Sequence, residues 1–256
     1  MFSCSQDLRV KLLLRRFGAF TLIELLVVIA ITGLLLSLLI PALGTSVQLA
    51  HTTRCQSNQR SLVTAAMGYR NDHGIHPPAI YYEQVDGTWN IITWEDVVWE
   101  YCTTTESTMA CPEHVHVRGG SGSGYNYNTD FIGAEAGMLQ GLEDAPPGIA
   151  PSACKHPSHT AMFGDGGEIA GDMGGYTTNR FMRSPKENDG GMSCAGSQSF
   201  RHRGATVVGW LDGHVSSEKT RFESYCQYDL WETNGFLSED DAAYDPRMLT
   251  LGEITN

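Results

Sequence analysis

The chain has few positive charges and lacks the common signatures of enzymes. Its 17 Lys and Arg face 29 Asp and Glu among 256 residues, for a formal net charge of −12 at pH 7. This balance argues against nucleic-acid binding, because a phosphate backbone repels an acidic surface. The sequence has no G-x-x-x-x-G-K-[ST] loop, no G-x-S-x-G elbow and no internal repeat. The usual signs of a P-loop enzyme and of an α/β-hydrolase are therefore absent, and we expect no enzymatic activity.

One long apolar run stands near the N-terminus, at residues 20–40. At a rise of about 1.5 Å per residue, a helix over this run spans roughly 32 Å, close to the hydrocarbon thickness of a bilayer. It contains a single acid, Glu24, which is costly in hydrocarbon unless it has a partner. Four basic residues precede the run, which places the N-terminus in the cytoplasm and the remaining chain outside. They are Arg9, Lys11, Arg15 and Arg16.

Three simpler interpretations of this run fit less well. A secretory signal peptide has a shorter apolar region that is followed by a small-residue cleavage site. Here the small residues Gly18 and Ala19 come before the run. A plain membrane anchor accounts for the length and the charges but not for Glu24. A buried helix of a soluble core is the least favoured, because the run is too long and too apolar.

The N-terminal segment resembles that of type IV prepilins and type II secretion pseudopilins. The resemblance rests on Gly18 and Ala19, the string FTLIE at 20–24, the apolar run and Pro41. It implies that a prepilin peptidase removes a leader, residues 1–19, and methylates the new amine of Phe20. In the family the acid is the fifth mature residue and the proline the twenty-second, and Glu24 and Pro41 match this register if cleavage follows Ala19. Cleavage after Gly18 is the alternative.

The resemblance implies a structural subunit of a type IV pilus-like or type II secretion-like filament. Its partners would be the prepilin peptidase, other pilin or pseudopilin subunits and the assembly platform of the inner membrane. Glu24 would pair with the Phe20 amine of a neighbouring subunit, since two charges that are costly apart stabilise each other when paired. The protein would be a single-pass protein of the cytoplasmic membrane, its head exported to the periplasm or the cell surface. The alternative is a membrane-anchored exported binding protein that holds zinc or calcium and builds no long filament.

Helical periodicity continues beyond Pro41 to about Asp72, and Gly74 and two prolines then give a stop signal. Leu43, Val47, Leu62, Ala65, Ala66 and Tyr69 recur at this spacing. We expect one helix of about 50 residues, kinked at Pro41, with a transmembrane and assembly half at 20–41 and an amphipathic half at 42–76. Residues 77–256 would form a β-rich head with antiparallel sheet, which makes the class α+β and pilin-like.

Within the head, turn signals separate short apolar segments. We expect a hairpin at 79–93 around Asp86 and Gly87, a short helix at 94–101 and a buried strand at 160–164. A second hairpin is expected at 202–217, where Asp212 and Gly213 suit the tight turn between two strands. Segments 118–127 and 133–151 are rich in Gly, Ser, Ala and Pro, which indicates loops.

The second hairpin carries a further resemblance. His202, nine intervening residues, then Asp212 and Gly213 match the H-x9-DG signature of prepilin-like proteins that are abundant in planctomycetes and verrucomicrobia. Four other phrases resemble the same family: CQSN at 55–58, ACP at 110–112, YNY at 125–127 and FGDG at 163–166. The family adds a class but no reaction. The simpler interpretation is that Asp212 and Gly213 form a turn and that His202 hydrogen-bonds the hairpin.

Loss of the leader leaves six cysteines, which an exported head can join in up to three disulfides with 15 pairings. Cys102 and Cys111 are the closest in sequence and the first expectation, whereas Cys55 on the long helix can instead be a small buried residue. Zinc binding is the alternative for Cys111, which lies close in sequence to His114 and His116. Cys154, His156 and His159 form a similar cluster of candidate zinc ligands. Neither cluster has the paired C-x2-C of a typical zinc site.

Calcium is an alternative metal, because oxygen ligands on a flexible loop suit it. Asp165, Glu168 and Asp172 stand in the Gly-rich segment at 164–175. Their spacing is not that of an EF-hand, and solvated acids in turns are the simpler interpretation. No cofactor is firmly expected.

Overall fold

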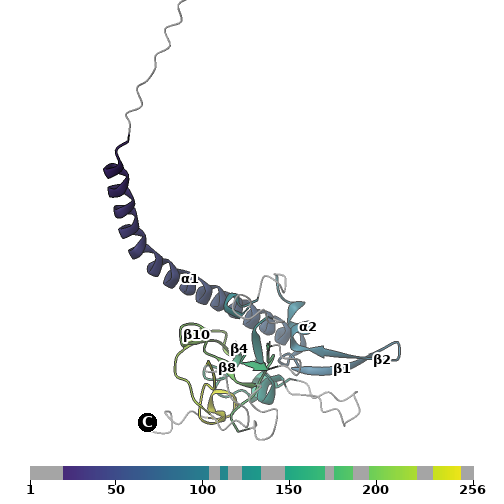
Figure 1. The fold of residues 1–256 in the computed structure, drawn as a ribbon. Helices are drawn as coiled ribbons and strands as arrows, with labels where there is room; N and C mark the ends of the chain where they lie inside the picture. Colours follow the sequence, from purple (N-terminus) through teal and green to yellow (C-terminus); the bar gives the residue numbers. More distant parts are fainter. Residues whose placement is uncertain are drawn as a thin grey trace, which may run out of the picture. The chain divides into compact units, whose positions relative to one another are not determined.

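The computed structural model describes residues 20–103, 110–114, 123–133, 148–170, 176–186, 196–223 and 233–248. It has the expected α+β, pilin-like composition of a long N-terminal helix followed by a β-rich head with antiparallel sheet (Figure 1). The chain divides into two compact units between Ser46 and Val47. The leader at 1–19, with Gly18 and Ala19, lies outside the described residues.

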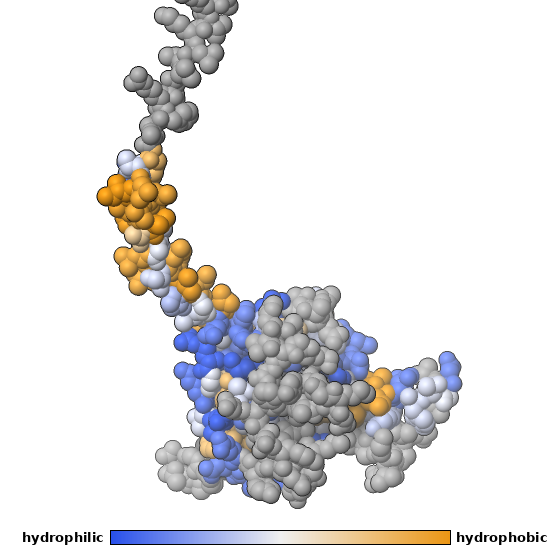
Figure 2. Space-filling model, in the orientation of Figure 1, coloured by the Kyte–Doolittle hydropathy of each residue, from blue (hydrophilic) through white to orange (hydrophobic). Residues whose placement is uncertain are grey.

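Helix α1 spans Leu22–His73, 52 residues, as the apolar and amphipathic patterns together predict. Its first half is covered with apolar side chains (Figure 2). Among the described residues it is the one helix long and apolar enough to cross a membrane. The hydroxyls of Thr32 and Ser37 donate to the carbonyls of Val28 and Leu34, so these polar groups are satisfied within the helix.

The second half of α1 belongs to the head unit and buries one face there. Leu62, Ala65 and Ala66 are buried as predicted, whereas Leu43 and Val47 are exposed because the buried face begins only at Cys55. The helix ends at His73, and the N–H of Gly74, which has φ +76°, donates to the Arg70 carbonyl. This positive φ explains why a glycine follows the helix. The complete buried face comprises Cys55, Asn58, Gln59, Leu62, Val63, Ala65 and Ala66.

A five-stranded sheet in the order β10-β9-β4-β3-β7 forms the centre of the head. Only β3 and β7 pair in parallel; the other neighbours are antiparallel. The expected strand at 160–164 and the expected hairpin at 202–217 are confirmed as β4 and as β9 with β10. The strands are β3 (Tyr125–Asn128), β4 (Ala161–Asp165), β7 (Phe181–Met182), β9 (Thr206–Trp210) and β10 (Val215–Glu218).

The expectation of a loop over 118–127 is wrong at its end, because residues from Tyr125 onward form β3 in the middle of the sheet. The Gly and Ser residues before it suggested a loop. The strand is stabilised by tertiary contacts instead: Tyr125 and Tyr127 are buried, and β3 pairs with β4 on one side and β7 on the other.

Smaller elements surround this sheet. The hairpin around Asp86 and Gly87 is confirmed, and both residues have positive φ, 51° and 81°, as a type I′ turn requires. The predicted helix after it is also confirmed. These elements are β1 (Ile80–Val85), β2 (Thr88–Thr93), α2 (Trp94–Trp99), β5 (Glu168–Ala170), β6 (Tyr176–Thr178), β8 (Gln198–Ser199), β11 (Asn234–Gly235) and the short helices η1 (Thr129–Gly133), η3 (Pro151–Ala153) and η5 (Asp241–Ala243).

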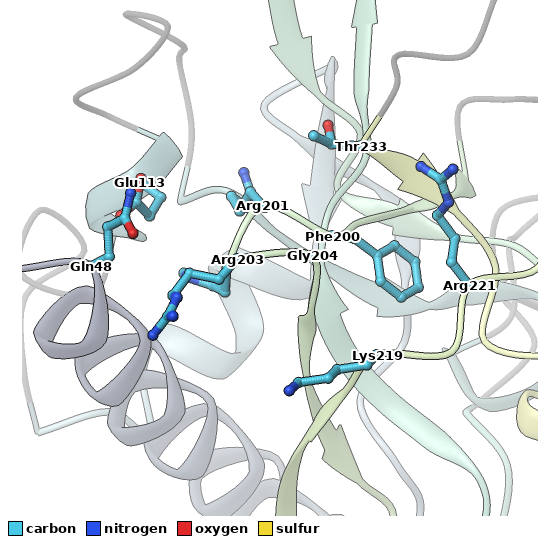
Figure 3. A pocket seen from close by; sticks show the side chains of 10 residues that line it. Gln48, Glu113, Phe200, Arg201, Arg203, Gly204, Lys219, Arg221 and Thr233 are labelled. Carbon is cyan, nitrogen blue, oxygen red and sulfur yellow. The ribbon is translucent and has the colours of Figure 1, made fainter. Parts of the chain in front are cut away.

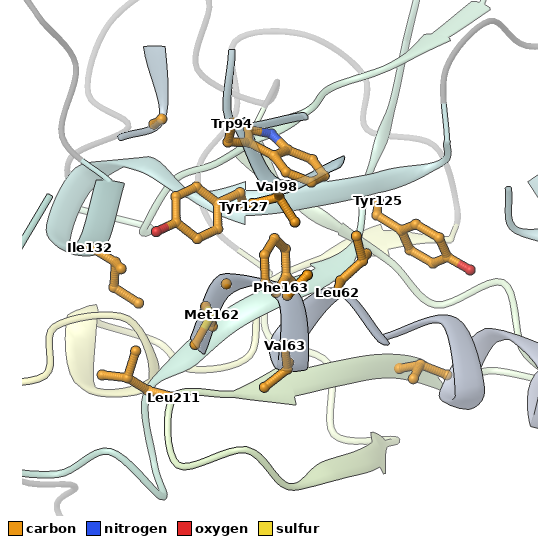
Figure 4. Packing of buried hydrophobic residues seen from close by; sticks show 14 of the residues in the cluster. Leu62, Val63, Trp94, Val98, Tyr125, Tyr127, Ile132, Met162, Phe163 and Leu211 are labelled. Carbon is orange, nitrogen blue, oxygen red and sulfur yellow. The ribbon is translucent and has the colours of Figure 1, made fainter. Parts of the chain in front are cut away.

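Two hydrophobic clusters share the strands of the sheet. The larger joins α1 and α2 to the sheet, with Leu62, Trp94, Tyr127 and Phe163 gathered at its centre (Figure 4). Trp94 and Phe163 have ring centroids 5.3 Å apart. The smaller contains Met182, Val208, Phe236 and Tyr244, so the C-terminal segment packs with β7 and β9. On β9, Val207 belongs to the larger cluster and Val208 to the smaller, as expected when successive side chains point to opposite faces.

Helix α1 packs tightly against β9 at Gly209. A Cβ atom at this position would lie 2.6 Å from Val63 Cγ2 and 3.2 Å from Gln59 Oε1. Any side chain here would push the helix away from the strand. The glycine therefore sets the distance between α1 and β9.

We predict that Gly209→Ala lowers the free energy of unfolding by about 1–3 kcal/mol, since overpacking a dense contact forces the backbone or Val63 to shift. Thermal unfolding of the detergent-solubilised full chain, followed by circular dichroism, would measure this. Gly44→Ala is the matched control, because nothing lies within 4 Å of a Cβ there. Equal melting temperatures for the Gly209 variant and the wild type would contradict the close-packing explanation.

Candidate functional site

Glu24 closes a capping box at the start of α1. Its Oε2 accepts hydrogen bonds from the backbone N–H of Thr21, at 2.9 Å, and from the Thr21 hydroxyl, at 2.6 Å. In return, the N–H of Glu24 donates to Thr21 Oγ1 at 3.3 Å. The two residues thus satisfy otherwise unpaired groups of the first helical turn. The string FTLIE consequently has a local structural use in addition to any role between subunits.

Pro41 lies within α1, and the helix continues past it. Proline removes one N–H of the helical ladder and disfavours the regular geometry of the preceding turn. Just after it, the hydroxyls of Thr45 and Ser46 both donate to the carbonyl of Ala42, at 2.9 Å. The kink at Pro41 stays a prediction.

The H-x9-DG signature frames strand β9. At one end, His202 and Ala205 exchange two backbone hydrogen bonds, 2.9 and 3.1 Å, across a tight turn. Arg203 and Gly204 form this turn with φ of 56° and 78°, the positive values of a type I′ turn. The nine intervening residues are thus Arg203 and Gly204 of the turn, Ala205, the five residues of β9 and Leu211, so the length of the strand accounts for the spacing between His202 and Asp212.

At the other end, Asp212 and Gly213 form the turn between β9 and β10. Asp212 Oδ1 accepts from the N–H of His214 at 3.1 Å and lies 2.6 Å from His214 Nδ1. Gly213 has φ +104°, and a Cβ there would lie 2.9 Å from Met67 Cε of α1. These contacts support the simpler interpretation of this dipeptide as a turn. His202 has different surroundings.

Four buried side chains meet around His202: Cys55 of α1, Cys111, Asp165 at the end of β4, and His202 itself. Their sulfur, oxygen and ring-nitrogen atoms all lie within 4.8 Å of one another, and each residue is at most 3% exposed. The two Sγ atoms are 3.0 Å apart. His202 Nε2 lies 3.6 Å from Cys111 Sγ and 3.3 Å from Asp165 Oδ2. The N–H of Val207 also donates to Asp165 Oδ2, at 2.7 Å. We name these four residues the Cys–Asp–His cluster.

Further contacts hold the segment at 110–114 on α1. One helical turn before Cys55, His51 Nδ1 lies 2.8 Å from Glu113 Oε1. One turn after it, the Asn58 amide donates to the Ala110 carbonyl at 3.4 Å and to the Tyr125 hydroxyl at 3.0 Å. Residues three and four apart share a helix face, so these contacts lie on either side of Cys55. Cys111 is therefore held opposite Cys55.

Charges around the cluster shift the ionisation of its members. Burial lowers the pKa of His202, but the Asp165 carboxylate and the contact with Cys111 outweigh this and raise that pKa to about 10. Burial raises the pKa of the Cys111 thiol, yet the Cys55 thiol, the Arg201 guanidinium and His202 together hold the pKa well below its usual range. The hydrogen bond to Cys111 and burial raise the pKa of Cys55. The cluster thus favours a thiolate at Cys111, a thiol at Cys55 and an imidazolium at His202.

The zinc clusters expected from sequence do not assemble as grouped. Cys111 lies with Cys55, Asp165 and His202. His114 instead contacts Thr178, whose hydroxyl oxygen is 2.9 Å from the Nε2 atom of His114. The thiol of Cys154 donates to the Ala150 carbonyl at 3.7 Å. His116 lies outside the described residues. Among those that the structure describes, the Cys–Asp–His cluster is the group whose donor atoms converge.

The structure also differs from the calcium site that the sequence suggested. Asp165 is fully buried and binds the backbone of β9 rather than lying in an open loop. Asp172 is not among the described residues, and the side chain of Glu168 is not described either. The expected Cys102–Cys111 bridge is not formed, because the four described cysteines are all unbridged; they are Cys55, Cys102, Cys111 and Cys154.

A pocket of about 570 Å³ lies beside the cluster, with His202 in its wall. Arg203 and Lys219 extend into it from different segments, and Glu113 lies near the α1 side (Figure 3). Arg201 and Arg221 complete a lining of four cationic side chains with one carboxylate. In a chain with a net charge of −12, this concentration of positive charge favours an anionic group.

The sequence analysis did not predict that residues from four of the five signature motifs meet in the fold. Cys55, Cys111, Asp165 and His202 come from the phrases CQSN, ACP, FGDG and H-x9-DG, and Tyr125 of YNY binds Asn58. The sequence did contain one signal. Each of the four motifs that contribute to the cluster includes a Cys, Asp or His, which can bind metal or take part in redox or acid–base chemistry. Nothing in their spacing indicated contact, since Cys55 and His202 are separated by most of the head.

Comparison with known proteins supports the N-terminal assignment. The family model described as the prokaryotic N-terminal methylation motif matches residues 14–40. No curated protein matches the chain, and no solved structure does. The matched segment contains Phe20, Glu24 and the whole apolar run. We conclude that the chain carries a prepilin-type N-terminal segment that continues into a helix long and apolar enough to cross a membrane.

We predict that His202→Gln destabilises the head most at neutral and acidic pH. The native pKa of about 10 lies above the ordinary value of 6.5, so the bound proton stabilises the fold fully below pH 6.5, and this contribution is lost as pH rises toward 10. The variant should lose about 2 kcal/mol at pH 6.5, because Asp165 loses its nearer cationic partner, while Arg201 Nη2 stays 3.9 Å from Asp165 Oδ1. Asp165, Cys111, Cys55 and Arg201 are the charged or titratable groups that face the imidazole.

Urea unfolding of the wild type and the variant at pH 6.5 and pH 10 would measure this difference. It should shrink at the higher pH, where the wild type also loses its imidazolium. His214→Gln is the control, since that side chain is 47% exposed in the β9–β10 turn. A difference that stays constant with pH would show that the charge of His202 contributes nothing.

Proposed function

We propose that this protein is a structural subunit, a prepilin or pseudopilin, of a type IV pilus-like or type II secretion-like filament. The observation that carries the proposal is the methylation motif at 14–40 on a helix of 52 residues. The leader is removed before Phe20, the new amine is methylated, and the head is exported while the first half of α1 stays in the membrane. The second half of α1 then forms part of the head.

Assembly would use the charge of Glu24. Among the described residues its carboxylate accepts hydrogen bonds from Thr21, whose neutral groups do not compensate the negative charge. A charge in hydrocarbon is expensive, and pairing with the amine of Phe20 on a neighbouring subunit reduces that cost. The pair also fixes the axial register of one helix against the next. The capping box holds the Glu24 carboxylate near the N-terminus of α1. In a filament, the Phe20 amine of a neighbouring subunit would lie beside it.

Processing gives the first test. Mass spectrometry of the mature protein should find an N-terminus at N-methyl-Phe20, because this register makes Glu24 the fifth residue and Pro41 the twenty-second. Expression without the prepilin peptidase is the control and should leave residues 1–19 in place. A mature chain beginning at Ala19 would support the alternative cleavage. A leader retained in the presence of the peptidase would refute the proposal.

The capping box allows the charge of Glu24 to be tested apart from its helix contacts. Glu24→Gln keeps an acceptor that suits the third helical position but removes the charge, so we expect normal membrane insertion and no filament. Thr21→Ala removes the cap but keeps the charge, and should still assemble. Sheared surface fractions and electron microscopy would score filaments, and membrane fractionation would score insertion. Filaments from the Glu24→Gln chain would eliminate charge pairing as the assembly device.

A second function has one observation in its favour. The cationic pocket formed by Arg201, Arg203, Lys219 and Arg221 suits an anion, which is typical of an exported binding protein that is merely anchored. Such a protein would need neither leader cleavage nor a charged Glu24. The two measurements above therefore separate it from a filament subunit.

A further inference from the structure

We propose that Cys55 and Cys111 form a disulfide that covalently joins α1 to the segment at 110–114 of the head. The inference rests on the proposed function in one respect: an exported head folds in an oxidising compartment, where disulfides persist. It extends that function by assigning a covalent link between the assembly helix and the domain it carries.

The two sulfurs are already placed for bonding. They lie 3.0 Å apart, on residues separated by 56 positions, and both cysteines are fully buried. A disulfide needs about 2.05 Å, so an approach of roughly 1 Å closes it. Two thiolates on one zinc ion, with bonds of about 2.3 Å and tetrahedral angles, stand about 3.8 Å apart. The observed separation is shorter than that of a metal-bound pair and longer than a disulfide, so the zinc content measured below separates the two.

The surrounding contacts keep the two cysteines in register. His51 with Glu113 lies on one side of the pair, and Asn58 with the Ala110 carbonyl lies on the other. The Tyr125 hydroxyl fixes the Asn58 amide from the sheet. A bridge between Cys55 and Cys111 would complete a row of contacts along one face of α1. This row requires no movement of secondary structure.

The bridge forms by ordinary exchange with a disulfide of an exported dithiol oxidant. The Cys111 thiolate attacks one sulfur of that disulfide and forms a mixed disulfide with it. The S–S bond of the oxidant breaks, and its other sulfur leaves as a thiolate. Cys55 then loses its proton and attacks Cys111 Sγ, which forms the new S–S bond and releases the second thiolate of the oxidant. In total, the two cysteines give up two electrons and two protons, one when the Cys111 thiolate forms and one from Cys55, and the oxidant becomes a dithiol. The fully buried sulfurs require this exchange to precede closure of the 110–114 segment on α1.

The charges of the cluster act on the reduced chain once the segment has closed on α1. Arg201 and His202 then lie near Cys111 and lower its thiol pKa, so the closed, reduced cluster favours a thiolate at Cys111. After oxidation the sulfur carries no charge, and His202 retains Asp165 as its partner. The buried ion pair of Asp165 and His202 is therefore present in both the reduced and the oxidised chain.

A bridge here closes a loop of 56 positions, long enough to stabilise the head substantially by restricting the unfolded chain. In a filament, tension along α1 would pass into the head through this bond. The hydrophobic contacts of Leu62 and Val63 with the sheet would otherwise bear it.

The experiment uses the full chain, purified in detergent from membranes of cells that export it. Free thiols are alkylated under denaturing conditions, and a digest is analysed by mass spectrometry with and without reductant. We expect one pair of peptides joined through Cys55 and Cys111, two hydrogens lighter than the separate peptides and released by reduction. Cys102 and Cys154 serve as internal comparisons. Alkylation of both Cys55 and Cys111 in this preparation and in the refolded chain described below, or a bridge from either to another cysteine, would overturn the proposal.

Thermal unfolding provides the second readout. Reductant should lower the melting temperature of the wild type by on the order of 10 °C and leave that of a Cys55→Ser, Cys111→Ser double variant unchanged. Cys154→Ser is the matched control and should respond to reductant as the wild type does. A zinc content near one per chain, lost together with stability on chelation, would overturn the disulfide in favour of a metal site.

Refolding separates this inference from the proposed function. The reduced, denatured chain is refolded in detergent with reduced and oxidised glutathione, and formation of the Cys55–Cys111 bridge there supports the pairing whatever the cellular location. A bridge formed in vitro but missing from the cell-derived protein would refute the exported head. Failure to form the bridge in either preparation would refute the pairing and leave the filament proposal standing.

Discussion

The structure of the head depends on the packing of one face of α1 against the central sheet. That face buries small residues such as Ala65 and Ala66, and Gly209 of β9 leaves room for Val63 and Gln59 of the same helix. Interiors pack near crystal density, so such a contact fixes the distance between the two elements within tenths of an ångström. Everything that α1 presents to the head, including Cys55 and Asn58, is positioned by it.

The same helix serves two environments with one continuous backbone. Its first half has apolar side chains in every direction, which suits hydrocarbon but cannot pack selectively against a sheet. Its second half has a polar outer face and a buried inner face. The polar residues that remain in the first half are satisfied locally, by carbonyls for Thr32 and by the capping box for Glu24. The capping box satisfies the hydrogen bonds of Glu24 but brings no positive charge to it from the described residues.

The buried Cys–Asp–His cluster gives the H-x9-DG signature a physical interpretation. The two parts of the signature do different work: Asp212 and Gly213 turn the chain, while His202 enters the interior and meets Asp165 and Cys111. A buried ion pair contributes little net stability but is costly to break, so it favours the packing that keeps the pair together over alternative packings of the chain. This arrangement ties the end of β4, the start of β9 and the segment at 110–114 to α1.

Local patterns in the sequence were enough to predict α1, the hairpin around Asp86 and Gly87, helix α2, β4 and the β9–β10 hairpin. Each is encoded by a period, a cap or a turn residue within a short window. Strand β3 was missed because Tyr125 and Tyr127 follow a Gly- and Ser-rich stretch, and only pairing with β4 and β7 stabilises them as a strand. Pairing partners of distant segments leave no local trace.

The sequence by itself determined the membrane-length helix, the prepilin-type segment with Glu24 in register, and the residue types available for chemistry. Only the tertiary structure decided which of those residues meet. Cys111 lies against Cys55 instead of Cys102, and Asp165 faces His202 inside the head instead of an open loop. The reason is that contact between side chains from different elements depends on how helix and strands pack, and spacing along the chain does not encode that packing.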